Sequence, residues 1–132
     1  MPAQHEAPGI ETVASPYSVD QTVERLTQLL ESKAIKLFAL IDHSGEAERA
    51  GFAMQNTKLI IFGNPAAGTP VMLAAPLSAI DLPLKILVSQ QPDGSSTISW
   101  NDPGWLQQRH NIWPQLVPNI SAVEGIVRKA LA

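Results

Sequence analysis

Two short stretches of this 132-residue chain carry residues suited to chemistry. The first, Asp42-His43-Ser44, follows an apolar run, and a histidine that titrates near neutral pH is the usual general base of enzymes. The second, residues 63–70 (GNPAAGTP), follows another apolar run, and glycine amides beside the start of a helix can bind an anion. Together these stretches predict a binding site or a catalytic site.

The glycine-rich stretch has two interpretations. As a ligand site, Gly63 and Gly68 offer backbone amides, and Asn64 and Thr69 add side-chain donors. As a structural corner, Asn64 caps a turn, Gly68 supplies a permissive dihedral angle, and Thr69 caps a helix that begins at Pro70. A nucleotide-hydrolysing phosphate loop requires Lys directly after the second glycine, where this chain has Thr69. The structural and ligand-binding interpretations both stay open.

Asp81 and His110 complete the set of candidate residues. Adjacent residues of a strand point to opposite faces, so Asp42 and His43 do not form a pair unless the chain bends between them. His43 can instead pair with Asp81 or His110. The histidines have no metal-ligand spacing, and we predict no metal and no cofactor. The predicted ligand-binding residues are Asp42, His43, Gly63, Asn64, Gly68, Thr69, Asp81 and His110, with His43 as the one catalytic candidate.

The composition excludes several classes of protein. Cysteine is absent, which excludes disulfides, thiolate metal sites and a cysteine nucleophile. The net charge of −3 and the scattered basic residues argue against binding of nucleic acid. No signal peptide or membrane-length apolar run is visible, so we expect no membrane association and a cytoplasmic location. Charged residues make up only 16% of the chain, which favours self-association.

These candidate residues must be positioned by alternating strands and helices. Apolar residues at helical spacing, behind a Ser18/Gln21 capping box, predict a helix over 19–33. The same signals at Ser121 and Glu124 predict a closing helix. An Asp-Gly pair predicts a hairpin between two strands. The expected strands are 9–15, 35–43, 57–63, 84–90 and 96–100; the expected shorter helical segments are 45–55, 70–83 and 102–110.

The order of elements predicts an α+β two-layer sandwich with an antiparallel sheet. The first strand is followed by the long helix, then by four strands with short helical insertions, then by the closing helix. We expect a single domain over residues 9–132, preceded by a flexible leader of residues 1–8.

Four segments occur in an order that resembles the bacterial and archaeal family called domain of unknown function 302. They are FALIDHSGEAERAG, LIIFGNPAAGTPVM, IDLPLKILV and DPGWLQQRH. The resemblance covers about residues 10–130 and implies a β-α-β4-α layout with the topology of the TATA-binding-protein fold. It also implies a homodimer, and it brings no established activity.

The sequence favours a homodimeric domain that binds a small ligand, with anions among the candidates, or a partner protein, over an enzyme. The alternative is a small-molecule enzyme with His43 as general base and the Gly63–Gly68 loop stabilising an anion. A third possibility is a purely structural interaction domain. Trp100, Trp105 and Trp113 are candidates for the dimer contact or for the core.

Overall fold

A computed structural model describes residues 7–132, so most of the predicted leader lies outside the described residues. Five antiparallel strands form one sheet in the order β1-β5-β4-β3-β2. Their bounds are β1 Ile10–Ser15, β2 Lys36–Asp42, β3 Thr57–Gly63, β4 Leu84–Gln90 and β5 Ser96–Asn101. The predicted α+β fold and its strand order along the chain are therefore confirmed.

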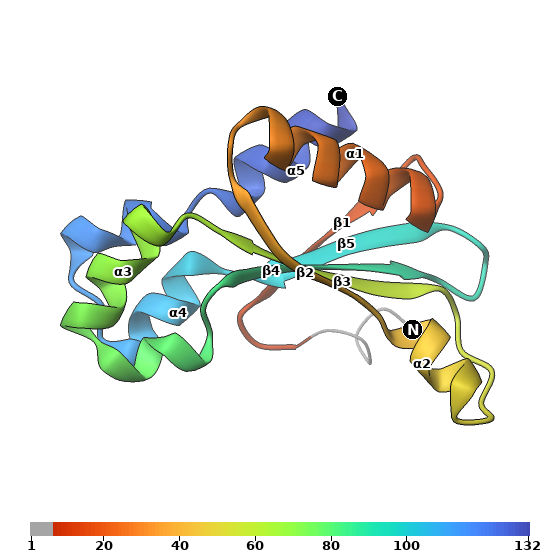
Figure 1. Ribbon diagram of the computed structural model, residues 1–132, viewed down its shortest axis with the longest axis horizontal. Helices are drawn as coiled ribbons and strands as arrows, with labels where there is room; N and C mark the ends of the chain where they lie inside the picture. The colour runs from red at the N-terminus through yellow and green to blue at the C-terminus, as the bar shows by residue number, and fades with distance from the viewer. Residues whose placement is uncertain (1–6) are drawn as a thin grey trace.

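Two helices, α1 (Val19–Ser32) and α5 (Val123–Leu131), cover one face of the sheet (Figure 1). The predicted capping box of α1 is present, with Ser18 and Gln21 each binding the other's backbone amide. Alternate residues of the central strands point towards these helices and are buried, as are the apolar stripes of both helices. This layer is the hydrophobic core, and burial of apolar area is its main stabilising contribution.

The opposite face of the sheet is not covered by a layer of helices within residues 7–132 (Figure 1). Lys85 lies on this face of β4, a central strand, and is paired with Ile61 of β3. Its Nζ donates to the backbone carbonyls of Pro83 and Asp81, at 3.0 and 3.3 Å, and partial burial lowers the pKa of Lys85. Backbone carbonyls therefore hold the ammonium group of Lys85 on a central strand.

Smaller helices gather at the two ends of the sheet (Figure 1). At one end, α2 (His43–Arg49) follows β2 directly. At the other lie α3 (Pro65–Ala74), the 3-10 helix η2 (Pro76–Ile80), α4 (Pro103–His110) and the 3-10 helix η3 (Pro114–Ile120). Asp102 caps α4 through the Trp105 amide, and Gly94 takes a positive φ in the predicted β4–β5 hairpin.

Helix α3 begins five residues earlier than the sequence predicts. Asn64 is its N-cap and accepts a hydrogen bond from the Ala66 amide at 2.9 Å, with Pro65 in the first helical position. Pro70 therefore lies inside the helix, where it cannot donate to the Ala66 carbonyl. Thr69 is not a cap, and Gly68 does not take a positive φ, so both structural roles predicted for them are wrong.

The predicted capping box of α5 is also wrong. The N-cap is Ala122, and the Ser121 hydroxyl donates to the Val117 carbonyl of the preceding 3-10 helix. Tertiary packing explains the difference, because Val123, Ile126 and Val127 are buried in the hydrophobic core and fix this helix without a side-chain cap.

Candidate functional site

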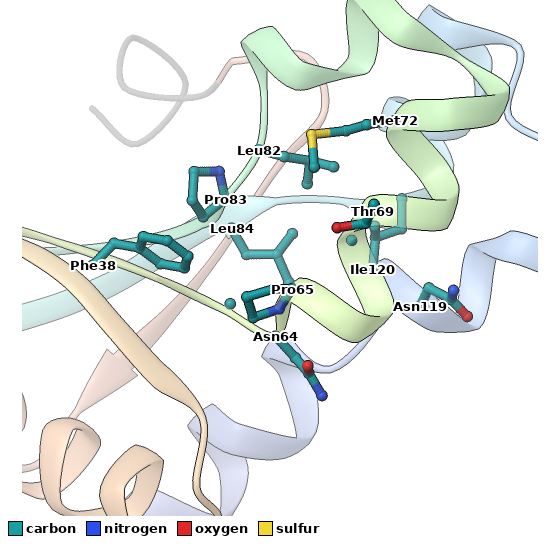
Figure 2. A pocket seen from close by; sticks show the side chains of 12 residues that line it. Phe38, Asn64, Pro65, Thr69, Met72, Leu82, Pro83, Leu84, Asn119 and Ile120 are labelled. Atoms are coloured by element: carbon teal, nitrogen blue, oxygen red, sulfur yellow. The ribbon is translucent and has the colours of Figure 1, made fainter.

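An apolar cavity of about 290 Å³ lies at the corner where β3 passes into α3 (Figure 2). We call it the corner cavity. Its walls come from the ends of β2 and β3, one side of α3, the segment that leads into β4, and the end of η3. The lining residues are Phe38, Gly63, Asn64, Pro65, Gly68, Thr69, Met72, Leu82, Pro83, Leu84, Asn119 and Ile120. Most of the lining residues are apolar, so the cavity fits an apolar group.

Three neutral polar side chains lie among the apolar ones. Asn64 uses its Oδ1 to cap α3, which leaves its Nδ2 group for other contacts. Asn119 donates from Nδ2 to the Ala67 carbonyl at 3.0 Å and so holds η3 against α3. Thr69 is exposed on the side of α3 that faces the cavity. Within residues 7–132 no charged residue lines the cavity, so specificity for a polar group rests on these amides and this hydroxyl.

Gly68 keeps the cavity open on its α3 side. A Cβ atom built on Gly68 would meet no heavy atom within 4 Å. Gly68 has helical backbone angles that an alanine would adopt easily, and glycine inside a helix costs about 0.5–1 kcal/mol relative to alanine. The backbone conformation at residue 68 therefore does not require glycine. The absence of a side chain at this position leaves space in the cavity.

Asp81 and His110 form a pair behind one wall of the corner cavity. The His110 Nε2 atom lies 2.5 Å from Asp81 Oδ2, and Arg109 Nη1 lies 3.3 Å from the same oxygen. The side chains of His110 and Asp81 are 7% and 17% exposed. This pair joins α4 to the segment that precedes Leu82, so it fixes a wall of the cavity without lining it.

A second, far smaller cavity separates His110 from the corner cavity. Its volume is about 10 Å³, and it shares Leu82 and Ile120 with the larger one. The Ser78 hydroxyl faces this space, is buried, and makes no hydrogen bond. The space is close to the minimum for one water molecule and is too small for a substrate.

Asp42 and His43 lie at the opposite end of the sheet. Asp42 pairs with Lys58 near the start of β3, whereas the corner cavity begins at Gly63, about 17 Å further along that strand. Asp42 caps α2 by accepting from the Gly45 amide at 3.0 Å, and it also accepts from Ser44 Oγ at 2.8 Å. These two hydrogen bonds, in that order of effect, lower the pKa of Asp42. His43 is the exposed first residue of the helix.

The structure therefore divides the eight predicted residues into three groups. Gly63, Asn64, Gly68 and Thr69 line the corner cavity, Asp81 and His110 pair behind it, and Asp42 and His43 lie at the far end. Sequence reasoning missed the apolar lining, above all Phe38, Met72 and Leu82. Periodicity assigns such residues to a core, and no local signal shows which of them face an empty space.

The sequence of residues 11–132 matches the family model described as Domain of unknown function DUF302. The chain belongs to this family. A crystal structure of an uncharacterized conserved DUF302 protein from Bacillus stearothermophilus is similar in fold, with a TM-score of 0.78 and 21% sequence identity. The similarity covers 95% of this chain and 97% of that one, and it supports the DUF302 fold of the whole domain.

Curated relatives of this DUF302 chain include two Brucella proteins named as fluoride-specific ion channels. The Brucella suis FluC 1 and Brucella abortus FluC 1 proteins are each 38% identical to it over 104 residues. The match covers 79% of this chain but only 41% and 38% of those proteins, so the chain spans about two-fifths of their length. Among the helices of residues 7–132, none is long and apolar enough to cross a membrane.

Proposed function

We propose that this DUF302 domain binds a small molecule with an apolar body in the corner cavity. The observation that carries the proposal is the unfilled space beside Gly68 in a cavity lined largely by carbon. A volume of about 290 Å³ lies near the lower end of the range for small-molecule sites. Transfer of apolar surface from water into such a cavity drives binding.

The cavity also has an arrangement that favours one orientation of the ligand. In Figure 2, Met72, Leu82 and Thr69 lie at one end of the lining, whereas Asn64 lies at the other end, beyond Pro65. A ligand of mixed character would place its carbon body against Met72 and Leu82 and its polar end near the Asn64 amide. Methionine adapts to ligands of different shape, which suits recognition by class more than by one structure.

We also propose that two copies of the domain associate. Leu73, Leu77 and Ile80, on α3 and η2, are 78%, 82% and 72% exposed, and they lie at intervals of four and three residues. Exposed apolar side chains of this size favour association with another surface, and a two-fold dimer would bury both copies of them. Trp100 is buried in the core and Trp105 packs over Gly9, which leaves Trp113 as the exposed tryptophan of the three.

The enzyme hypothesis has less support. His43 lies at the other end of the sheet from the Gly63–Gly68 corner, so one small substrate cannot contact both. The histidine closer to the corner, His110, is committed to Asp81 and has only the small internal cavity beside it. Fluoride transport, named for the Brucella relatives, is not assigned to this chain because the match covers two-fifths of those proteins.

The test of the cavity is a Gly68→Leu substitution, which would fill it from α3. We expect octanol, used as an uncharged apolar probe in an NMR titration, to bind the wild type in the corner cavity. Gly68→Leu should weaken this binding at least about tenfold, because the new side chain occupies the space of more than one methylene group. Thermal unfolding should show that the variant is at least as stable as the wild type.

Gly125→Leu is the matched control for that experiment. Gly125 lies on the exposed side of α5, and a Cβ atom there also meets no heavy atom within 4 Å. We expect Gly125→Leu to leave octanol binding unchanged. Equal binding of octanol by wild type and Gly68→Leu would contradict the proposal.

The proposed dimer has its own test. Light scattering after size exclusion should give the mass of a dimer for wild type and of a monomer for Leu77→Glu. A wild-type monomer at every concentration would overturn the proposed dimer.

A further inference from the structure

We infer that the ligand of the corner cavity carries a negatively charged head group, bound by Lys36 at the rim. The inference rests on the proposed function and adds the chemical class of the ligand: an amphiphilic anion, such as a short-chain carboxylate, with its carbon chain in the cavity. Lys36 does not line the cavity and was not among the residues that the sequence pointed to.

The strand pairing places Lys36 beside the cavity. Lys36 is the first residue of β2, and its register partner on β3 is Gly63, which lines the cavity. Paired residues of antiparallel strands have Cα atoms about 4.5–5.5 Å apart. The Lys36 Nζ atom lies 4.7 Å from the centre of the Phe38 ring, and Phe38 is another lining residue. The ammonium group is therefore held on the aromatic wall of the cavity.

Phe38 has two roles in this arrangement. Phe38 is 42% exposed, so part of the residue contacts the cavity and part faces solvent, and the Lys36 ammonium group lies over its ring. An ammonium group over an aromatic ring gains about 0.5–1 kcal/mol at an exposed site, which restrains the side chain without neutralising its charge. The lysine thus keeps its charge available for a ligand.

The surrounding charges also favour an anion. Lys36 forms no salt bridge within residues 7–132, and no carboxylate lines the corner cavity. The acid that precedes the cavity wall, Asp81, is occupied by His110 and Arg109. An anionic head group at the rim would therefore meet one cation and the Asn64 amide, and it would meet no opposing acid among the lining residues.

The experiment compares two probes of equal chain length, octanoate and octanol, on four forms of the full chain. Wild type, Lys36→Gln, Lys36→Arg and Lys129→Gln are titrated with each probe at low and high salt. Lys129 is exposed on α5, so its substitution changes the net charge equally without altering the rim of the cavity. We expect Lys36→Gln to weaken octanoate binding about twofold to fivefold, the range of an exposed ion pair, and to leave octanol binding unchanged.

The remaining variants and salt complete the expected pattern. Lys36→Arg should keep the octanoate affinity, Lys129→Gln should behave as wild type, and high salt should remove the advantage of Lys36. If octanol and octanoate bind but Lys36→Gln and Lys129→Gln give equal octanoate affinities, the head-group inference is overturned and the cavity proposal stands. If neither probe binds wild type, both are overturned.

Discussion

Strand β3 begins at Thr57 beside a network of polar side chains and ends at Gly63 beside an apolar cavity. At the Thr57 end, Asp20 accepts hydrogen bonds from Lys58 at 2.7 Å and from Asn56 at 3.1 Å. There, Ser44 donates to Asp42 and accepts from the Thr57 amide. At the Gly63 end, side chains leave an unfilled space instead of bonding to one another.

The difference teaches that polar character alone does not mark a binding site. The acids at the Thr57 end cap a helix and bind neighbouring donors, so their hydrogen-bonding capacity is used within the fold. The Gly63 end contains fewer polar groups and holds a cavity lined largely by apolar residues, whereas the shallow depression at the Thr57 end is lined in part by charged and polar residues. The candidate site is recognised here by apolar lining around an unfilled volume, with a few unused polar groups beside it.

The largest expected effect of a substitution on stability is at Asp81, behind the cavity. Asp81→Ala removes the partner of the buried His110 ring and of Arg109, and we expect a loss of about 1–3 kcal/mol in the free energy of unfolding. Octanol binding should weaken as well, because the Asp81 pair fixes the Leu82 wall. Urea denaturation measures the loss, with Glu124→Ala, which removes an exposed helical ion pair, as control. If Asp81→Ala and Glu124→Ala lost equal free energy of unfolding, the Asp81–His110 pair would not stabilise this wall of the cavity.

The sequence predicts the layout of this fold because local signals agree with tertiary packing in most elements. The Ser18/Gln21 capping box, the Asp-Gly hairpin and the alternating strands all act over a few residues. The sequence fails at Thr69 and Pro70, where Asn64 and Pro65 start the helix earlier than the second proline suggests. Asn64-Pro65 and Thr69-Pro70 both have the pattern of a cap followed by a proline in the first helical position, and the helix begins at the earlier pair.

The candidate site is less predictable for a different reason. Gly63, Asn64, Gly68 and Thr69 were predicted from local sequence and do line the cavity. The remaining lining depends on contacts between distant segments, such as the approach of η3 to α3 through the bond between Asn119 and the Ala67 carbonyl. Lys36 reaches the rim through its pairing with Gly63, which no spacing along the chain reveals.

An intermediate effect is expected at Gly68 when it is replaced by alanine. Gly68→Ala should raise the free energy of unfolding by about 0.5–1 kcal/mol, since helical glycine is replaced without a clash. The same variant should weaken octanol binding, because its methyl group enters the cavity. Gly125→Ala should give the stability gain alone. Calorimetric melting and probe titration separate the two effects, and a Gly68→Ala protein with unchanged binding would argue against the cavity as the site.

The smallest effect is expected at the Thr57 end, from Asp42→Asn. Hydrogen bonds from Gly45 and Ser44 lower the pKa of Asp42 in the folded protein, so its contribution to stability is present above the unfolded pKa of about 3.9. That contribution is lost as the pH falls through the folded value. Melting temperatures of wild type and variant should therefore differ at pH 7 and converge as the pH falls below the unfolded pKa and through the lowered folded pKa. Octanol binding should be unchanged, and a large loss of binding would move the site to this end of the sheet.

The most direct test uses the two methionines that report on the two ends. Met72 lines the corner cavity, whereas Met54 lies in a shallow depression beside Asp42. With carbon-13 label in the methionine methyl groups, octanoate is added and both resonances are followed by NMR. Our account predicts that the Met72 methyl group shifts and shows nuclear Overhauser contacts to the octanoate chain while the Met54 methyl group stays in place. A shift of Met54 with no change at Met72 would contradict it.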